Sequence, residues 1–192
     1  MSSRDSLLKT TKELLWDRGY DALSPRTIQA ESGTGQGSFY HHFRGKEDLA
    51  RHAVNEVSKE MREALQSLFA TDKKPMDRIR DYLLNSRAGL RGCRLGKLAQ
   101  EEAVVGNSLI HPIAEYFSYL EEILVRTLEQ AKQEGELEQD IAVEALVAMI
   151  ASVVQGGYVL SRARQNPQQM DMAVNGAWDL LERMKRRPSD DV

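Results

Sequence analysis

The stretch 23–49 constrains the fold most, because it carries start and stop signals for two short helices in close succession. Ser24 stands at a favourable N-cap position, and Pro25 follows it at the first helical position, where a missing N–H costs nothing. Gly33 can adopt the left-handed conformation that ends a helix. A second helix is expected over 36–43. Two short helices joined by a glycine turn predict a helix-turn-helix.

The second of these helices has side chains that can contact the bases and phosphates of DNA. The major groove admits one α-helix, whose first turns present polar side chains to base edges. Gln36 can form the paired hydrogen bonds that recognise adenine, and Ser38 can bond to either base. Tyr40, His41 and Lys46 can reach phosphates, which position a protein on the duplex.

A pattern at fixed spacing extends through the same stretch: Thr27-Ile28, Gly33, Gly37-Ser38-Phe39-Tyr40, Phe43 and Lys46-Glu47-Asp48-Leu49. This pattern resembles the N-terminal domain of TetR-family transcriptional regulators and covers about the first quarter of the chain. The resemblance implies binding to a double-stranded DNA operator. The predicted DNA-contacting residues are Arg26, Thr27, Gln36, Ser38, Tyr40, His41 and Lys46.

Two positions depart from the family pattern at the start of the reading helix. Gly35 stands where the family often has a capping Ser, and Thr34 stands where a small apolar residue is usual. Gly caps a helix less tightly than Ser and adds backbone entropy. The helix over 36–43 is therefore expected to be less ordered in the absence of DNA.

Composition limits the kind of DNA contact and the compartment. The chain has 192 residues, a net charge of -3 and a pI near 5.9, which argues against nonspecific coating of nucleic acid. Any DNA contact is therefore expected to be local. No apolar run follows Met1, so no signal peptide is expected, and the single Cys93 cannot form an internal disulfide. Both features are typical of a cytoplasmic protein.

Apolar residues recur at helical spacing along the rest of the chain, and no stretch alternates long enough to predict a sheet. The predicted fold is all-α. It has an N-terminal three-helix helix-turn-helix head, joined by a long helix to a C-terminal helical domain, for which the family resemblance implies ligand binding and dimerisation. The further helices are expected over 5–18, 46–69, 75–88, 97–105, 108–135, 141–160 and 167–185.

The helix over 5–18 should end at Gly19 and cover the two short helices, with Trp16 as a partly buried packing residue. The core of this head is expected to hold Tyr20, Leu23, Ile28, Phe39 and Phe43. The helix over 46–69 would span about 35 Å and is interpreted as a lever between sensing and DNA binding. The predicted domains are the DNA-binding head over 1–48, the effector-binding and dimerisation domain over 49–188, and a frayed tail over 189–192.

The stretch 141–160 is nearly all apolar and has the length that a membrane span requires. We interpret it instead as a soluble helix, because it contains Glu144 and lies among amphipathic helices. Its small residues, Ala151, Ser152, Gly156 and Gly157, would let another helix approach closely. The family resemblance implies that the last two helices pair with those of a second chain, giving a homodimer without a membrane partner.

Cys93 has two possible interpretations. It lies among Arg91, Arg94 and Lys97, which could make the thiol reactive, and Gly92-Cys93 with Lys97 resembles electrophile-responsive members of the family. A lone cysteine is also an ordinary buried residue. The resemblance implies a cavity for a small-molecule effector, for which the available side chains are His111, Tyr116, Phe117, Tyr119, Met149, Tyr158 and Trp178. The nominated sensing residues are Cys93, His111, Phe117 and Tyr158.

An enzyme is not predicted, because the chain lacks a catalytic or metal-binding constellation. Glu101, Glu102 and His111 have no further ligand at suitable spacing, and Glu101-Glu102 is interpreted as a solvated helix face. No cofactor or metal is expected. The sequence therefore predicts a ligand-responsive repressor that binds a palindromic operator as a dimer. The alternative is a helical ligand-binding or protein-interaction module without specific DNA binding.

Overall fold

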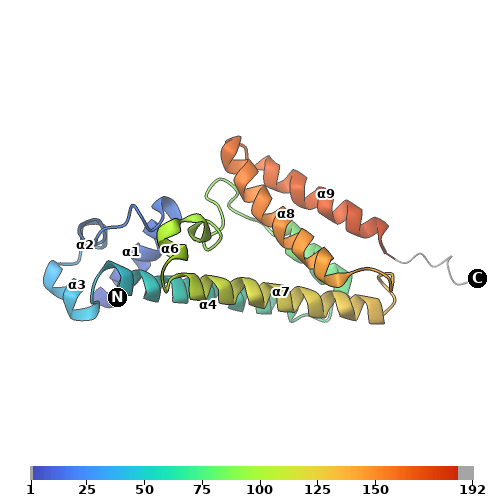
Figure 1. Ribbon diagram of the computed structural model, residues 1–192, viewed down its shortest axis with the longest axis horizontal. Coiled ribbons are helices and arrows are strands. Elements are labelled where there is room, and N and C mark those ends of the chain that lie inside the picture. Colours follow the sequence, from blue (N-terminus) through green and yellow to red (C-terminus); the bar gives the residue numbers. More distant parts are fainter. Residues whose placement is uncertain (1, 186–192) are drawn as a thin grey trace, which may run out of the picture. The chain divides into compact units, whose positions relative to one another are not determined.

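The computed structural model describes residues 2–185, in which the chain folds into helices (Figure 1). An isolated β-bridge joins Leu137 to Lys185, and this range contains no strand, so the all-α prediction is confirmed. The elements are α1 (Ser3–Arg18), α2 (Pro25–Ser32), α3 (Gln36–His42), α4 (Lys46–Phe69), α5 (Pro75–Leu84), the 3₁₀ helix η1 (Leu98–Gln100), α6 (Glu102–Val105), α7 (Ile110–Gln133), α8 (Val143–Ala163) and α9 (Gln168–Arg183).

The chain divides into two compact units, each made of segments that are separated in sequence. The first unit contains Met1–Met61 and Arg91–Phe117, and the second contains Arg62–Leu90 and Ser118–Val192. The long helices α4 and α7 each contribute residues to both units. The sequence-based division after residue 48 stays a prediction, and the tail predicted over 189–192 lies outside the described residues.

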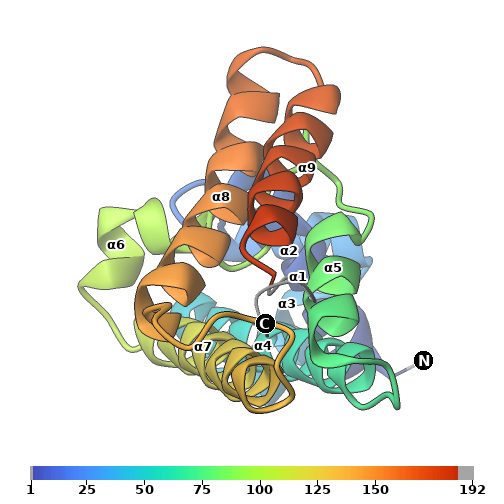
Figure 2. The ribbon, with the colours of Figure 1, turned by 90° about the vertical axis from the view of Figure 1, so that its right-hand side faces the viewer.

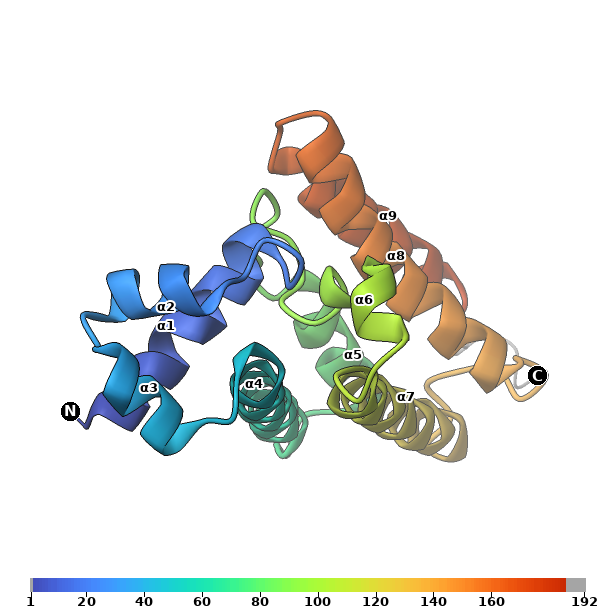
Figure 3. The ribbon, with the colours of Figure 1, turned by 60° about the vertical axis from the view of Figure 1, so that its left-hand side comes forward.

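In the first unit, α1 packs against α2 and α3, and the three helices gather into a head (Figure 3). Their shared core was predicted from the sequence and is confirmed, since all five expected side chains are buried: Tyr20, Leu23, Ile28, Phe39 and Phe43. Burying a side chain of this size contributes about 1.5–3 kcal/mol. A few such residues are therefore enough to fix the angle between short helices that would be unstable alone.

The helix α1 begins two residues before its expected start because Ser2 caps it. The Ser2 hydroxyl accepts a hydrogen bond from the Asp5 N–H, and the Asp5 carboxylate accepts one from the Ser2 N–H. This reciprocal pair is a capping box, which satisfies N–H groups that a helix start leaves without partners. The expected end is confirmed, since Gly19 follows Arg18 with φ of 84°.

The prediction of a single helix over 97–105 is wrong, because the chain forms η1 and then α6 there. Glu101 separates the two with an extended backbone, at φ of -91° and ψ of 123°. Its carboxylate accepts hydrogen bonds from the backbone N–H groups of Tyr20 and Asp21. The interpretation of Glu101 as part of a solvated helix face is therefore wrong as well.

In the second unit, α8 packs along α9, and α5 packs against α9 (Figure 2). The close approach expected at the small residues of α8 occurs at Gly157, where an added Cβ would lie 2.8 Å from the Met170 sulfur of α9. The helix α5 ends at Leu84, four residues before the expected 88. There the Arg87 guanidinium donates to the carbonyls of Tyr82, Leu83 and Asn85, which satisfies the helix end without another turn.

The remaining helices begin and end within three residues of their expected limits.

Among the described residues, α8 is the one helix long and apolar enough to cross a membrane by length and composition. Core helices of soluble proteins pass the same test, so this is weak evidence for a membrane span. Only 33% of its most apolar stretch is buried within the chain.

Candidate nucleic-acid interface

The helix-turn-helix is built from local signals that act as the sequence predicts. The Ser24 hydroxyl accepts a hydrogen bond from the Thr27 N–H at 3.1 Å, which caps α2 ahead of Pro25. Gly33 ends the helix in the left-handed conformation, with φ of 67°. The Thr34 N–H then donates to the Gln29 carbonyl at 3.1 Å, which closes the turn. The start and end of α2 are therefore confirmed.

The helix α3 has one buried face and one exposed polar face. Phe39 is fully buried on the inner side. Gln36, Tyr40 and His41 are exposed, with Tyr40 at 54%. None of these three side chains makes a hydrogen bond within the part of the chain that the structure describes. Their polar groups are therefore available to a partner such as DNA.

The other predicted DNA-contacting residues differ in their exposure to solvent. Arg26 is exposed on the first turn of α2, whereas Thr27 is half-buried with its hydroxyl 2.8 Å from that of Ser24. Ser38 is half-buried on α3. The Lys46 ammonium lies 4.2 Å from the ring centroid of Tyr20, a cation–π contact that keeps the charge beside the head.

The N-cap of α3 is Gly35, which provides no side-chain hydrogen bond to the helix. The amide groups of the first turn therefore lack the acceptor that a Ser would supply. This agrees with the weaker cap expected from the sequence. The order of the helix in solution stays a prediction.

The first turn of α4 contains a carboxylate that organises the loop after α3. Asp48 accepts a hydrogen bond from the Arg44 backbone N–H at 3.1 Å and one from the Arg51 guanidinium at 2.7 Å. These bonds, chiefly the one from the backbone, lower the pKa of Asp48 below its usual value. Asp48 therefore stays ionised and holds Arg44, which is exposed, next to the predicted phosphate anchor Lys46.

The two neighbouring histidines of α3 have different surroundings. His41 is exposed, whereas the His42 ring nitrogen Nε2 lies 3.0 Å from the Ser3 hydroxyl of α1. Adjacent helical residues point about 100° apart, so the sequence indicated that the pair could not easily bind one metal ion together. The contact from His42 to α1 needed the tertiary structure.

A segment far along the chain holds the end of α1 within the first unit. Lys97 donates to the carbonyls of Trp16 and Asp17, both at 2.9 Å, and the Trp16 indole donates to the Gly92 carbonyl at 2.8 Å. Arg91 lies 3.6 Å from the centroid of the Trp16 ring. Trp16 is half-buried, as predicted. Sequence reasoning missed these contacts because their partners are more than 70 residues apart.

Cys93 is a free cysteine in this same segment and is only 6% exposed. Its sulfur accepts a hydrogen bond from the Gly96 N–H at 3.3 Å. The three cationic side chains near it in sequence have other partners: Arg91 binds Glu13 and Asp17, Arg94 binds Glu60, and Lys97 caps α1. The burial is that of a packing residue, and the sensing role stays a prediction.

The other nominated sensing residues lie on the two helices α7 and α8. His111 is exposed at the start of α7, and Phe117 is half-buried with its ring centroid 5.1 Å from that of Tyr116. Tyr158 is half-buried on α8, in the second unit. Among the described residues, no group of three His, Cys, Asp or Glu side chains could hold a metal ion.

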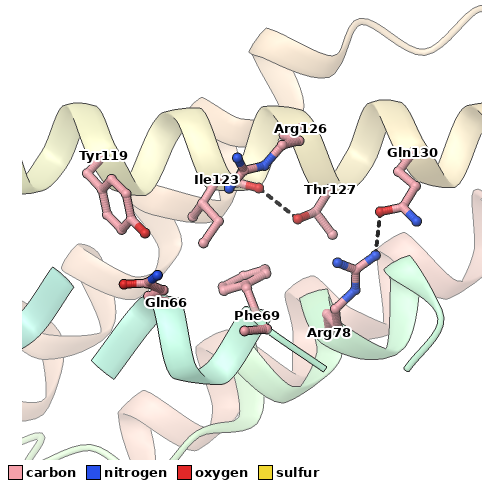
Figure 4. Close-up of a pocket in the computed structure, with 9 residues that line it drawn as sticks. Gln66, Phe69, Arg78, Tyr119, Ile123, Arg126, Thr127 and Gln130 are labelled. Carbon is pink, nitrogen blue, oxygen red and sulfur yellow. Dashed lines mark hydrogen bonds between the residues drawn. The ribbon is translucent and has the colours of Figure 1, made fainter. Parts of the chain in front are cut away.

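A cavity of about 340 Å³ lies within the second unit (Figure 4). It is lined by Gln66, Phe69, Ala70, Arg78, Tyr119, Ile123, Arg126, Thr127 and Gln130. Tyr119 was among the aromatic residues considered for a pocket, and none of the four nominated sensing residues lines this one. Sequence reasoning missed the Arg and Gln residues of the lining, because each has the pattern of a solvent-exposed position on its own helix.

Two family descriptions match most of the chain. Residues 7–53 match "Bacterial regulatory proteins, tetR family", and residues 74–177 match "Tetracyclin repressor-like, C-terminal domain". Among curated relatives, the HTH-type transcriptional regulator LmrA of Bacillus subtilis is 27% identical over 188 residues, which cover 94% of this chain and 97% of LmrA. An uncharacterised HTH-type transcriptional regulator of Lactococcus lactis is 24% identical and covers 86% of each chain.

Solved structures show the same fold at lower identity. A regulatory protein TetR from Rhodobacter sphaeroides superposes with a TM-score of 0.82 at 21% identity, covering 96% of this chain and 99% of its own. The reduced form of Escherichia coli NemR gives a TM-score of 0.80 at 18% identity, covering 97% and 98%.

Proposed function

The chain belongs to the TetR family of bacterial regulatory proteins, which are helix-turn-helix transcriptional regulators, and we propose that it is a repressor released from a palindromic operator by an effector. One observation carries the proposal. The exposed face of α3 presents Gln36, Tyr40 and His41 with no hydrogen bond to other described residues, on a helix whose opposite face is locked into the core by Phe39.

The roles of these side chains follow from their chemistry. Gln36 lies in the first turn of α3, where a side chain can read base edges in the major groove. Tyr40 and Lys46 are assigned to phosphates, together with the amide groups at the start of α4, where the helix dipole favours negative charge. The net charge of -3 makes these few contacts the source of affinity, because the whole chain does not attract DNA.

We propose that a homodimer forms through α8 and α9. These helices expose large apolar side chains, including Val159 at 52%, Met172 at 67% and Leu180 at 59%. Apolar surface of this kind on a soluble chain favours a partner. A two-fold dimer carries two copies of α3 and matches half-sites about one helical turn, 34–36 Å, apart.

Release from DNA requires an effector that prefers the form unable to span both half-sites. We propose that the effector binds the C-terminal half and acts through α4, which contributes residues to both compact units. Only a difference in its affinity for the two forms can shift their populations. Modification of Cys93 is the competing route, and because its side chain is only 6% exposed, the reaction is slow unless the surrounding loop opens.

The decisive experiment selects bound duplexes from a random DNA pool with the purified protein and sequences them. Enrichment of a two-fold symmetric site supports the dimeric reader. A folded dimer that enriches no sequence and is not retained on duplex DNA instead supports the interaction module. Alkylation of Cys93 followed by measurement of operator release separates a thiol sensor from a reversible one.

Variants then test the assigned contacts on the selected operator. Tyr40→Ala and Lys46→Ala should each weaken binding, and Lys46→Ala should reduce the slope of log K against log salt by roughly 2 for a dimer, since each phosphate contact contributes about 0.9. Lys9→Ala on the exposed side of α1 is the control for loss of charge alone. If Lys9→Ala and Lys46→Ala changed operator affinity and its salt slope equally, the assignment of Lys46 to a phosphate would be refuted.

A further inference from the structure

The cavity of the second unit is a groove between three helices. Gln66 and Phe69 come from α4, Ala70 directly follows that helix, Arg78 comes from α5, and the other lining residues come from α7. We call it the α4–α5–α7 groove. Its α7 side runs from Tyr119 to Gln130, about 16 Å along the helix axis at 1.5 Å per residue. Its volume of about 340 Å³ is within the range of small-molecule sites.

The charge of the groove is positive. Arg78 and Arg126 line it, and no Asp or Glu does. Neither guanidinium forms an ion pair with a carboxylate among residues 2–185. In the first unit, by contrast, Arg91 binds both Glu13 and Asp17. Two guanidinium groups that line one cavity, without a carboxylate partner among the described residues, favour an anion there.

Arg78 is held in place by a neutral partner. Its Nη2 donates to the Gln130 side-chain oxygen at 2.5 Å (Figure 4). The Gln130 amide donates in turn to the Glu134 carboxylate at 2.7 Å. Its Nε is buried and has no hydrogen-bond partner in the described structure. A buried donor of this kind gains from an acceptor, and a guanidinium presents a planar fork that suits carboxylate or phosphate oxygens.

The rest of the groove is less polar. Phe69 and Ile123 supply its apolar wall, and Figure 4 shows Gln66 and Tyr119 towards one end with Arg78 and Gln130 towards the other. The Thr127 hydroxyl is already used, since it donates to the Ile123 carbonyl at 2.7 Å. A ligand would therefore have a charged end, an apolar body and room for one further polar group.

We propose that the α4–α5–α7 groove binds an amphipathic organic anion, with its carboxylate or phosphate monoester at Arg78 and Arg126 and its apolar body against Phe69 and Ile123. An amphipathic anion is then the chemical class of the effector. The connection between its binding and release from DNA rests on the proposed function. The binding itself depends only on the groove.

The first test measures binding of octanoate, octyl phosphate, octanol and octylamine to the full chain by isothermal titration calorimetry. The two anions share the apolar chain of the other probes and differ in the head group. Binding of either anion at least tenfold tighter than octanol supports the proposal. Equal or tighter binding of octanol or octylamine, or no binding of either anion, overturns it.

Variants assign the binding to this groove. Arg126→Gln and Arg78→Gln should each lower the affinity for the anion about tenfold. This is the lower end of the range for a hydrogen bond to a charged group, because the groove is open to water. Arg80→Gln is the matched control, since Arg80 is exposed on α5 and does not line the groove. A loss of affinity shared by all three variants would place the anion elsewhere.

Methyl NMR gives a readout that does not depend on the variants. With isoleucine δ1 methyl labelling, the anion should shift the Ile123 signal and leave Ile28, in the core of the head, unchanged. An unshifted Ile123 at saturating anion overturns the site. Operator binding measured without any probe separates the two hypotheses: its absence would refute the proposed function, while the calorimetry and the Ile123 shift would still decide the groove.

Discussion

Replacing Glu101 by Ala should destabilise the protein by about 2 kcal/mol. The carboxylate accepts hydrogen bonds from the Tyr20 N–H at 2.8 Å and the Asp21 N–H at 3.0 Å, across 81 and 80 residues of sequence. A hydrogen bond to a charged group contributes about 1.5–3 kcal/mol when its partner is buried. The Asp21 amide lies at an exposed residue and regains water on substitution, so the sum is nearer to one full bond than two.

The measurement is chemical and thermal unfolding followed by circular dichroism. A loss of 2 kcal/mol corresponds to a fall in Tm of about 4–8 °C for a domain of this size. The urea midpoint should fall without a change in slope, since the same surface is exposed on unfolding. Glu102→Ala is the matched control, because the neighbouring carboxylate is exposed and makes no hydrogen bond with described residues. Its effect should stay within about 0.5 kcal/mol.

A second change tests the same contact from the other side. An Ala at position 19 would place its Cβ 2.4 Å from the Glu101 carboxylate and would also be strained at φ of 84°. In the Glu101→Ala background the clash disappears and only backbone strain of about 1–3 kcal/mol remains, since φ of 84° with ψ of 177° is a conformation that almost only glycine adopts. Gly19→Ala should therefore cost less in that background. Additive effects, or equal effects of Glu101→Ala and Glu102→Ala, would refute the reasoning.

Phe39→Ala should cost about 3–5 kcal/mol of stability, because the ring is fully buried, whereas Tyr40→Ala should change stability by less than about 0.5 kcal/mol; urea unfolding of both variants checks this. The lowered pKa of Asp48 means that its contribution to stability is complete above the unfolded pKa of about 3.9 and is lost as pH falls through the folded pKa. The stability difference between wild type and Asp48→Asn should therefore be constant at neutral pH and vanish in acid. Gly157→Ala should destabilise, because overpacking against the Met170 sulfur at 2.8 Å costs about 1–3 kcal/mol and outweighs a gain in helix propensity of up to about 1 kcal/mol; a raised Tm would contradict this.

The sequence by itself determined the helices whose signals are local. Ser24 and Gly33 fixed the limits of α2, because a capping hydroxyl and a left-handed glycine act within a few residues. The apolar spacing of Phe39 and Phe43 fixed which face of α3 is buried, and this left Gln36 and Tyr40 on the exposed face. The exposed face of α3 could therefore be predicted from the sequence, and its contacts with DNA stay a prediction.

The tertiary structure alone decided contacts between residues far apart in the chain. Nothing near Glu101 in sequence indicates that it breaks a helix in order to bind the Tyr20 amide. Nor does either local pattern indicate that Arg78 and Arg126 line one groove, since each reads as the solvated side of its own helix. Periodicity and capping report the energy of one segment, whereas these contacts depend on which faces of different helices meet, and that is set by packing of the whole unit.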